Sequence, residues 1–167
     1  MSTLTIVQAD YGLPAHAEAV VSLLNAYAQD IAGGGEALSA FTMANLVREL
    51  AARPQVYSIL AFDGAAPVGL VNCIEGFSTF ACKPLVNVHD VAVVASHRGR
   101  GLAAQMLALA EEIARQRGAV KMTLEVLTGN KSALALYQRL GFAGYQLDPS
   151  MGTATFMQKL LPAPPAQ

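Results

Sequence analysis

The 167 residues carry a formal net charge of −1 and are 53% hydrophobic, a balance that argues against sequence-independent binding to nucleic acid. No apolar run reaches the roughly 18 residues needed to span a bilayer, and the N-terminus lacks a secretory signal pattern, so we expect a cytoplasmic protein without a membrane partner. The two cysteines, Cys73 and Cys82, are too few for a disulfide framework and lack further zinc ligands, so we expect free thiols and no metal site.

The N-terminal part of the chain predicts one strand and two helices. Residues 3–9 alternate weakly between apolar and polar side chains, which favours a strand, and residues 16–28 repeat apolar side chains at helical spacing. Residues 32–36 contain three consecutive glycines, which cost too much entropy inside a regular element and therefore indicate a loop. A second helix is predicted over residues 42–52 and ends before a proline.

The middle of the chain predicts the centre of a sheet. Residues 56–62 and 68–77 favour two strands of a hairpin, because the turn signals Asp-Gly and Pro lie between them at residues 63–67. Residues 85–94 are apolar and rich in valine, and they form the longest predicted strand.

A glycine-containing turn follows this strand. It reads Arg98-Gly99-Arg100-Gly101-Leu102-Ala103 and opens an amphipathic helix that ends at Gly118. The free N–H groups and positive dipole end of a helix N-terminus suit a phosphate, and glycine lets an anion approach the backbone closely. The turn lacks the third glycine of a dinucleotide fingerprint and the Lys-Ser or Lys-Thr of a Walker loop, so it is also compatible with ordinary turn chemistry.

The C-terminal part predicts a strand, a short helix and a final hairpin. Residues 120–127 read as a buried strand, which makes a right-handed βαβ unit with residues 85–94 and implies a parallel pair. A helix over residues 131–140 stops at a glycine. Residues 142–146 and 153–160 then read as a last antiparallel pair. We expect one domain over residues 1–160 and a disordered, proline-rich tail over residues 161–167.

A second motif runs from Asn130 to Phe142 and reads N-K-S-A-L-A-L-Y-Q-R-L-G-F. Together with R-x-x-G-x-A at Arg98, Gly101 and Ala103, it resembles the GNAT superfamily of acyl-CoA-dependent N-acetyltransferases. The resemblance is close over residues 85–142. It implies an α/β (α+β) GNAT fold, in which a mixed, mostly antiparallel sheet splays at a central parallel strand pair and is flanked by helices.

The same resemblance implies acetyl-CoA as co-substrate, with its pyrophosphate at the glycine turn and its pantetheine arm in the splayed cleft. Backbone groups of Val91 and Val93 would pair with that arm, Asn130 would contact it, and Tyr137 would lie near the thioester sulfur. The residues implied in cofactor binding are Val91, Ala92, Val93, Arg98, Gly99, Arg100, Gly101, Leu102, Ala103, Asn130, Ser132 and Tyr137.

Acetyl transfer to an amine needs a neutral amine and a proton for the departing thiolate. Tyr137 is a plausible acid, because an ordinary tyrosine pKa of about 10 lies above that of a thiol near 8.5. His89 suits the base, or the anchor of a water chain that acts as one, and Asp90 suits an orienting or substrate-binding role. Successive strand residues point to opposite faces, although a bulge could bring His89 and Asp90 to one site.

The chain also has some likeness to the diamine (spermidine/spermine) acetyltransferase branch, around Phe77-Ser78-Thr79-Phe80 and Val88-His89-Asp90. That branch usually has Glu-Asp in place of His89-Asp90, so a polyamine remains one option beside small amines, amino acids, aminoglycosides and protein amines. The residues that we expect to contact the acceptor are Glu75, Phe77, Phe80 and Tyr27.

Two further expectations concern the function class and the assembly. A non-catalytic acyl-CoA sensor or interaction module on the same fold is the alternative to an enzyme, because fold alone does not decide function. We also expect a homodimer, from the high apolar content, the absence of tryptophan and the habit of the family.

Overall fold

The computed structural model describes residues 3–162. Within them one mixed sheet has the strand order β1-β2-β3-β4-β5, antiparallel from β1 to β4 and parallel between β4 and β5. The strands are β1 (Leu4–Gln8), β2 (Val56–Asp63), β3 (Ala66–Ser78), β4 (Lys83–Val93) and β5 (Met122–Leu124). The α-helices are α1 (Pro14–Gln29), α2 (Ala40–Ala51), α3 (Leu102–Gln116) and α4 (Lys131–Arg139), and the 3₁₀ turns are η1 (Ile31–Gly33), η2 (Ala95–His97) and η3 (Pro149–Met151). The predicted mixed, mostly antiparallel fold is confirmed.

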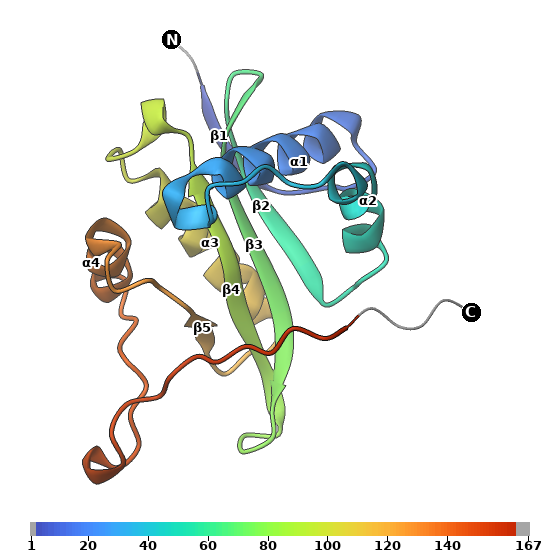
Figure 1. Ribbon diagram of the computed structural model, residues 1–167. Coiled ribbons are helices and arrows are strands. Elements are labelled where there is room, and N and C mark those ends of the chain that lie inside the picture. The colour runs from blue at the N-terminus through green and yellow to red at the C-terminus, as the bar shows by residue number, and fades with distance from the viewer. Residues whose placement is uncertain (1–2, 163–167) are drawn as a thin grey trace.

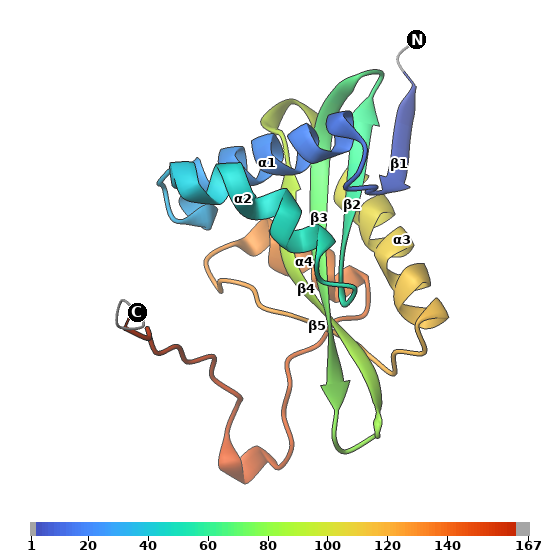
Figure 2. The same cartoon turned by 90° about the vertical axis from the view of Figure 1, so that its right-hand side faces the viewer.

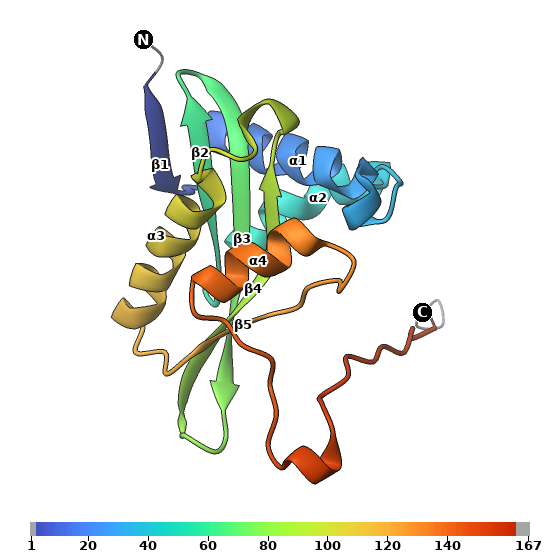
Figure 3. The same ribbon diagram turned by 90° about the vertical axis from the view of Figure 1, so that its left-hand side faces the viewer.

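Helices cover both faces of the sheet. Figures 1 and 2 show α1 and α2 on one face, and Figure 3 shows α3 and α4 on the other. Strand alternation supplies both cores: Ile59 and Val71 pack with Met106 of α3, whereas Leu60 and Leu70 face α1. No helix within residues 3–162 is long and apolar enough to cross a membrane.

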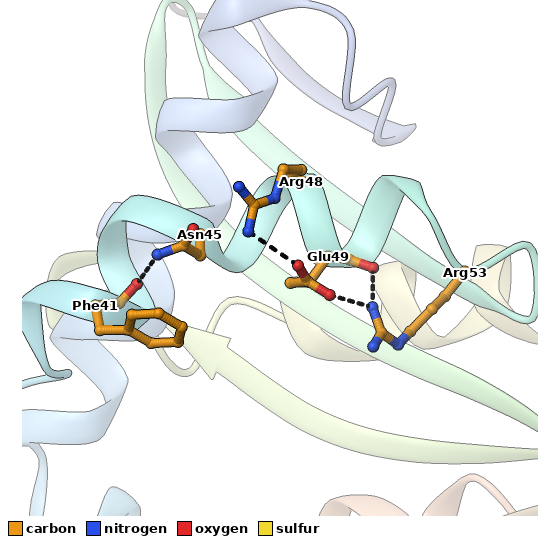
Figure 4. Close-up of polar contacts among 5 residues, drawn as sticks. All are labelled: Phe41, Asn45, Arg48, Glu49 and Arg53. Carbon is orange, nitrogen blue, oxygen red and sulfur yellow. Dashed lines mark hydrogen bonds and ion pairs between the residues drawn. The ribbon is translucent and has the colours of Figure 1, made fainter. Parts of the chain in front are cut away.

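Helix α2 carries its polar contacts on the side away from the sheet (Figure 4). Arg48 and Arg53 both bond to the Glu49 carboxylate, at 3.2 and 2.8 Å, and the Arg53 guanidinium also reaches the Glu49 carbonyl at 2.6 Å. At the other end, the Ser39 hydroxyl caps the helix by accepting the Thr42 N–H at 3.0 Å. Because the Arg–Glu pairs are exposed, they contribute little to stability, and the packing of the opposite face holds the helix.

The predicted end of the sheet is wrong. Residues 142–146 and 153–160 form no strand, and β5 is shorter than the predicted 120–127. A strand needs a hydrogen-bonding neighbour, and this segment runs away from the sheet (Figures 2 and 3). Its apolar side chains face solvent, as Phe156 at 69% and Leu160 at 86% exposure show. Of the predicted tail, residues 163–167 lie outside the described residues, and the domain limits 1–160 remain a prediction.

Candidate active site

A β-bulge in β4 is the first feature of the site. Asn72 pairs with Asp90 and the next β3 residue, Cys73, pairs with Val88, so His89 is an extra residue without a β3 partner. Val88 packs in the core on the α3 side, which turns His89 to the α1 face. Asp90 reaches the same face, because its carboxylate accepts the Asn72 Nδ2–H at 2.9 Å. The bulge therefore directs both titratable groups to one side of the sheet.

The sheet opens directly after the bulge. The parallel pairing of β4 and β5 ends at Val88 and Leu124, while β4 continues to Val93. Because the Val94 N–H donates to Val68 of β3 at 3.0 Å, alternation directs the backbone groups of Val93 and Val91 to the open edge. The open edge is the splayed cleft that the sequence predicts.

The glycine turn closes one end of this cleft. Gly99 and Gly101 have φ values of 73° and 75°, a region that glycine adopts without strain, and α3 begins at the next residue, Leu102. Because Gly99 and Gly101 have no side chains, neither residue covers the free N–H groups of the first turn of α3. Arg98 fixes the turn to β4, because its Nε donates to the Val93 carbonyl at 2.9 Å.

Arg98 also ties the turn to the loop after α1. Its Nη2 lies 3.0 Å from Asp30 Oδ2. The Ala32 N–H and then the Arg98 guanidinium hold the pKa of Asp30 below its ordinary value. Part of the Arg98 charge is therefore already compensated by protein. The sequence carries no sign of this contact, because the two residues are far apart in the chain and meet only through the fold.

A cavity of about 1160 Å³ joins the turn, the open edge of β4 and α4. The sequence-predicted residues that line it are Tyr27, His89, Val91, Ala92, Val93, Arg98, Gly99, Gly101, Leu102, Ala103, Asn130, Ser132 and Tyr137. Leu23 of α1 and Ile31 of the loop after it also line the cavity and were not predicted as site residues. In the sequence these residues look like ordinary parts of a helix and a loop, so nothing there marks them as site residues.

Five predicted site residues lie outside the lining. Glu75 is bound by Arg117 at 3.2 Å, Phe77 and Phe80 are exposed near the β3–β4 hairpin, and Arg100 points to solvent. Asp90 does not line the cavity itself but lies between two residues that do, and its charge acts on the Tyr27 hydroxyl. The structure therefore brings Asp90 to the margin of the site, as it does Arg100 between the lining residues Gly99 and Gly101, and leaves Glu75, Phe77 and Phe80 apart from it.

Tyr137 projects from α4 into the cavity. Asn130 caps the start of the helix, because its side chain accepts the Ala133 N–H at 3.2 Å. The tyrosine ring packs edge-on against Phe142, with 6.0 Å between the ring centroids. Burial, and to a lesser extent Tyr27, raise the pKa of Tyr137 above 10.0. The raised pKa favours the protonated hydroxyl, and within residues 3–162 no protein group accepts its proton, so the hydroxyl is available as a donor.

Asn87 orients His89. The Asn87 amide donates to Thr123 of β5, at 3.2 Å to Oγ1, so its carbonyl oxygen is left to accept. That oxygen lies 3.3 Å from His89 Nδ1, which places the proton of a neutral imidazole on Nδ1. Nε2 then carries the lone pair that a base needs. Asn87 was missed as a site residue, although its position two residues before His89 puts both on one strand face.

Within residues 3–162 no three His, Cys, Asp or Glu side chains gather in a way that could hold a metal ion. The chain also matches a known family. The model of the Acetyltransferase (GNAT) family aligns with residues 20–142, which include the bulge, the glycine turn and Tyr137. The chain belongs to this family. The protein is therefore a GNAT acetyltransferase, as the two sequence motifs predict.

The chain is also similar to three named proteins. Streptothricin acetyltransferase of Streptomyces lavendulae is 28% identical, over 85% of each chain. Thialysine N-epsilon-acetyltransferase of Caenorhabditis elegans is 29% identical, over 86% of each chain. A structure of AAC(6')-Iy in complex with the bisubstrate analogue CoA-S-monomethyl-acetylneamine has a TM-score of 0.75 and 18% identity, with 96% of this chain and all of that chain covered. The last likeness is one of fold.

Proposed function

We propose that the protein transfers the acetyl group of acetyl-CoA directly to a primary amine of a small molecule or peptide. The observation that carries the proposal is the single cavity that connects the glycine turn with His89 and Tyr137 along the open edge of β4. Its glycine end offers free N–H groups to a pyrophosphate. Its middle offers strand backbone and apolar walls to the amide-containing pantetheine arm.

The chemistry assigns one role to each titratable group. The amine nitrogen forms a bond to the thioester carbon, and the carbon–sulfur bond breaks. The proton of the amine passes to His89 Nε2, or to a water held there, and the departing sulfur takes the Tyr137 proton. The raised pKa of Tyr137 keeps that proton in place until the thiolate forms.

In the proposed site, Asp90 and Tyr27 lie where the acceptor amine binds. Asp90 is the carboxylate nearest to His89 along β4, and an ammonium group would be drawn to it before deprotonation. Two similar proteins support a cationic acceptor. One is the thialysine relative, named for acetylation at the epsilon nitrogen, and the other is AAC(6')-Iy, an aminoglycoside acetyltransferase of the same fold that binds a CoA bisubstrate analogue. Both are also compatible with the predicted likeness to diamine acetyltransferases.

We also propose a homodimer. The exposed apolar side chains of the C-terminal segment support it, because Leu147, Phe156 and Leu160 are each at least 69% exposed and such surface commonly marks association. Light scattering at micromolar concentration tests the assembly. A mass twice that of the chain is expected, and a strictly monomeric mass would contradict it.

An amine panel tests the activity. Thiol release from acetyl-CoA should require an acceptor, and the panel should include a polyamine, an aminoglycoside, streptothricin, thialysine and peptides with free amino groups. A Cys82→Ser variant keeps the exposed protein thiol from adding to the signal. Tight binding of acetyl-CoA with no thiol release for any amine would instead favour the non-catalytic sensor.

A further inference from the structure

A row of polar side chains crosses the sheet behind the acceptor end of the site. Ser58 of β2 pairs in register with Asn72 of β3, and Asn72 pairs with Asp90 of β4. Their side chains are bonded in the same order, with 2.6 Å between Ser58 Oγ and Asn72 Oδ1 and 2.9 Å between Asn72 Nδ2 and Asp90 Oδ2. The Tyr11 hydroxyl, from the segment before α1, lies 2.8 Å from Ser58 Oγ. We call Tyr11, Ser58 and Asn72 the polar row.

Stability does not explain the polar row. The neighbouring row on the same face is apolar and consists of Leu60, Leu70 and Ala92. Ser58 is 0% and Asn72 6% exposed, and burying polar groups is costly unless they are fully bonded. Replacing both partners of a buried hydrogen bond with apolar groups is often neutral for folding. The sheet could therefore have continued its apolar packing here.

The hydrogens of the row have one direction. An ionised Asp90 carboxylate only accepts, so Asn72 must turn its amide nitrogen toward it and its oxygen toward Ser58. Ser58 has one hydrogen and gives it to that oxygen. Tyr11 must then donate to Ser58, and burial raises the pKa of Tyr11, so the hydroxyl keeps its proton. Every hydrogen thus points toward Asp90, and each bond polarises the next.

We propose that the polar row is a positioning device that holds the Asp90 carboxylate in one orientation toward the acceptor amine. Asp90 Oδ2 is bound by Asn72, and within residues 3–162 Oδ1 has no side-chain partner, which leaves it for the ligand. The inference rests on the proposed function, in which Asp90 orients the amine. The proposal adds three residues that touch neither substrate. Asn72 holds Asp90 directly, Ser58 acts through Asn72, and Tyr11 acts through Ser58.

The test is a double-mutant cycle on kcat/KM for the best amine of the panel. Ser58→Ala should lower kcat/KM about three- to tenfold in the wild-type background and have no effect beside Asp90→Asn. Tyr11→Phe, one bond further away, should lose less. Ser22→Ala removes a hydroxyl that bonds only within α1 and serves as the control. Equal losses in both backgrounds, or none in either, would overturn the proposal.

A second measurement does not depend on turnover. In ¹⁵N–¹H spectra the Asn72 side-chain amide should shift strongly in Asp90→Asn and measurably in Tyr11→Phe, but not in the control Tyr145→Phe, whose exposed ring lies over Lys121. An unchanged Asn72 signal in Tyr11→Phe would overturn the directed row even in an active enzyme. If no amine is acetylated but the signals shift as expected, the row stands and the proposed function fails.

Discussion

Replacing Gly101 with alanine should separate cofactor binding from folding. Gly101 and Gly118 bracket α3 with φ values of 75° and 76°, and an added Cβ would meet no atom within 4 Å at either position. Each substitution to alanine should therefore cost a similar amount of stability, about 1–2 kcal/mol for a left-handed L-residue. Of these two glycines, only Gly101 lines the cavity, so Gly118→Ala is a matched control at the opposite end of the helix.

The difference in CoA affinity between the two variants tests whether the turn at Gly101 binds the pyrophosphate. The methyl group that Gly101→Ala adds would enter the space where a pyrophosphate must approach the helix N–H groups. Losing one hydrogen bond to a charged group costs about 1.5–3 kcal/mol, or roughly ten- to a hundredfold in Kd. Calorimetry with CoA should find that loss in Gly101→Ala and near wild-type affinity in Gly118→Ala. Equal affinities in the two variants would refute binding of the pyrophosphate at this turn.

Three further predictions concern single side chains. Tyr137→Phe should lower kcat on the order of tens- to thousands-fold with nearly unchanged acetyl-CoA affinity, and the raised pKa of Tyr137 should keep the wild-type enzyme active to pH values where an ordinary tyrosine ionises. His89→Ala should remove the acidic limb of the rate–pH profile and lose less activity at high pH, where the amine is already neutral; an unchanged profile would make the residue structural. Burial raises the pKa of Cys73 from 9.0 to about 12. The stability that the protonated thiol contributes is therefore complete below pH 9 and is lost as the pH rises toward 12. Between pH 9 and 10 the free energy of unfolding should fall by on the order of 1 kcal/mol more in wild type than in Cys73→Ala.

Local patterns were sufficient for much of the fold and part of the site. The glycine turn, the helix that bears Tyr137 and the parallel strand pair each rest on residues close together in the chain, and a bulge at His89 could be suspected from two adjacent polar residues inside an apolar strand. Contacts set by register could not be predicted. Asn72 meets Ser58 and Asp90 only because three strands align at those positions.

The wrong prediction has a similar cause. The segment after Gly141 has the apolar residues and turn signals of a hairpin, but a hairpin also needs a sheet edge that accepts it. β5 is only three residues long, and the described part of the segment remains without strand partners. Its exposed apolar side chains are the reason to look for a dimer, and their pattern alone could not distinguish intramolecular from intermolecular burial.

Mass spectrometry of a complete reaction tests the central claim most directly. The protein would be incubated with acetyl-CoA bearing an isotope-labelled acetyl group, with and without the amine that gives the fastest thiol release. Direct transfer predicts that the label appears on the amine, that CoA is released in equal amount, and that the protein keeps its unmodified mass in both samples. A labelled protein in the absence of amine, or no labelled product with any acceptor, would contradict the account.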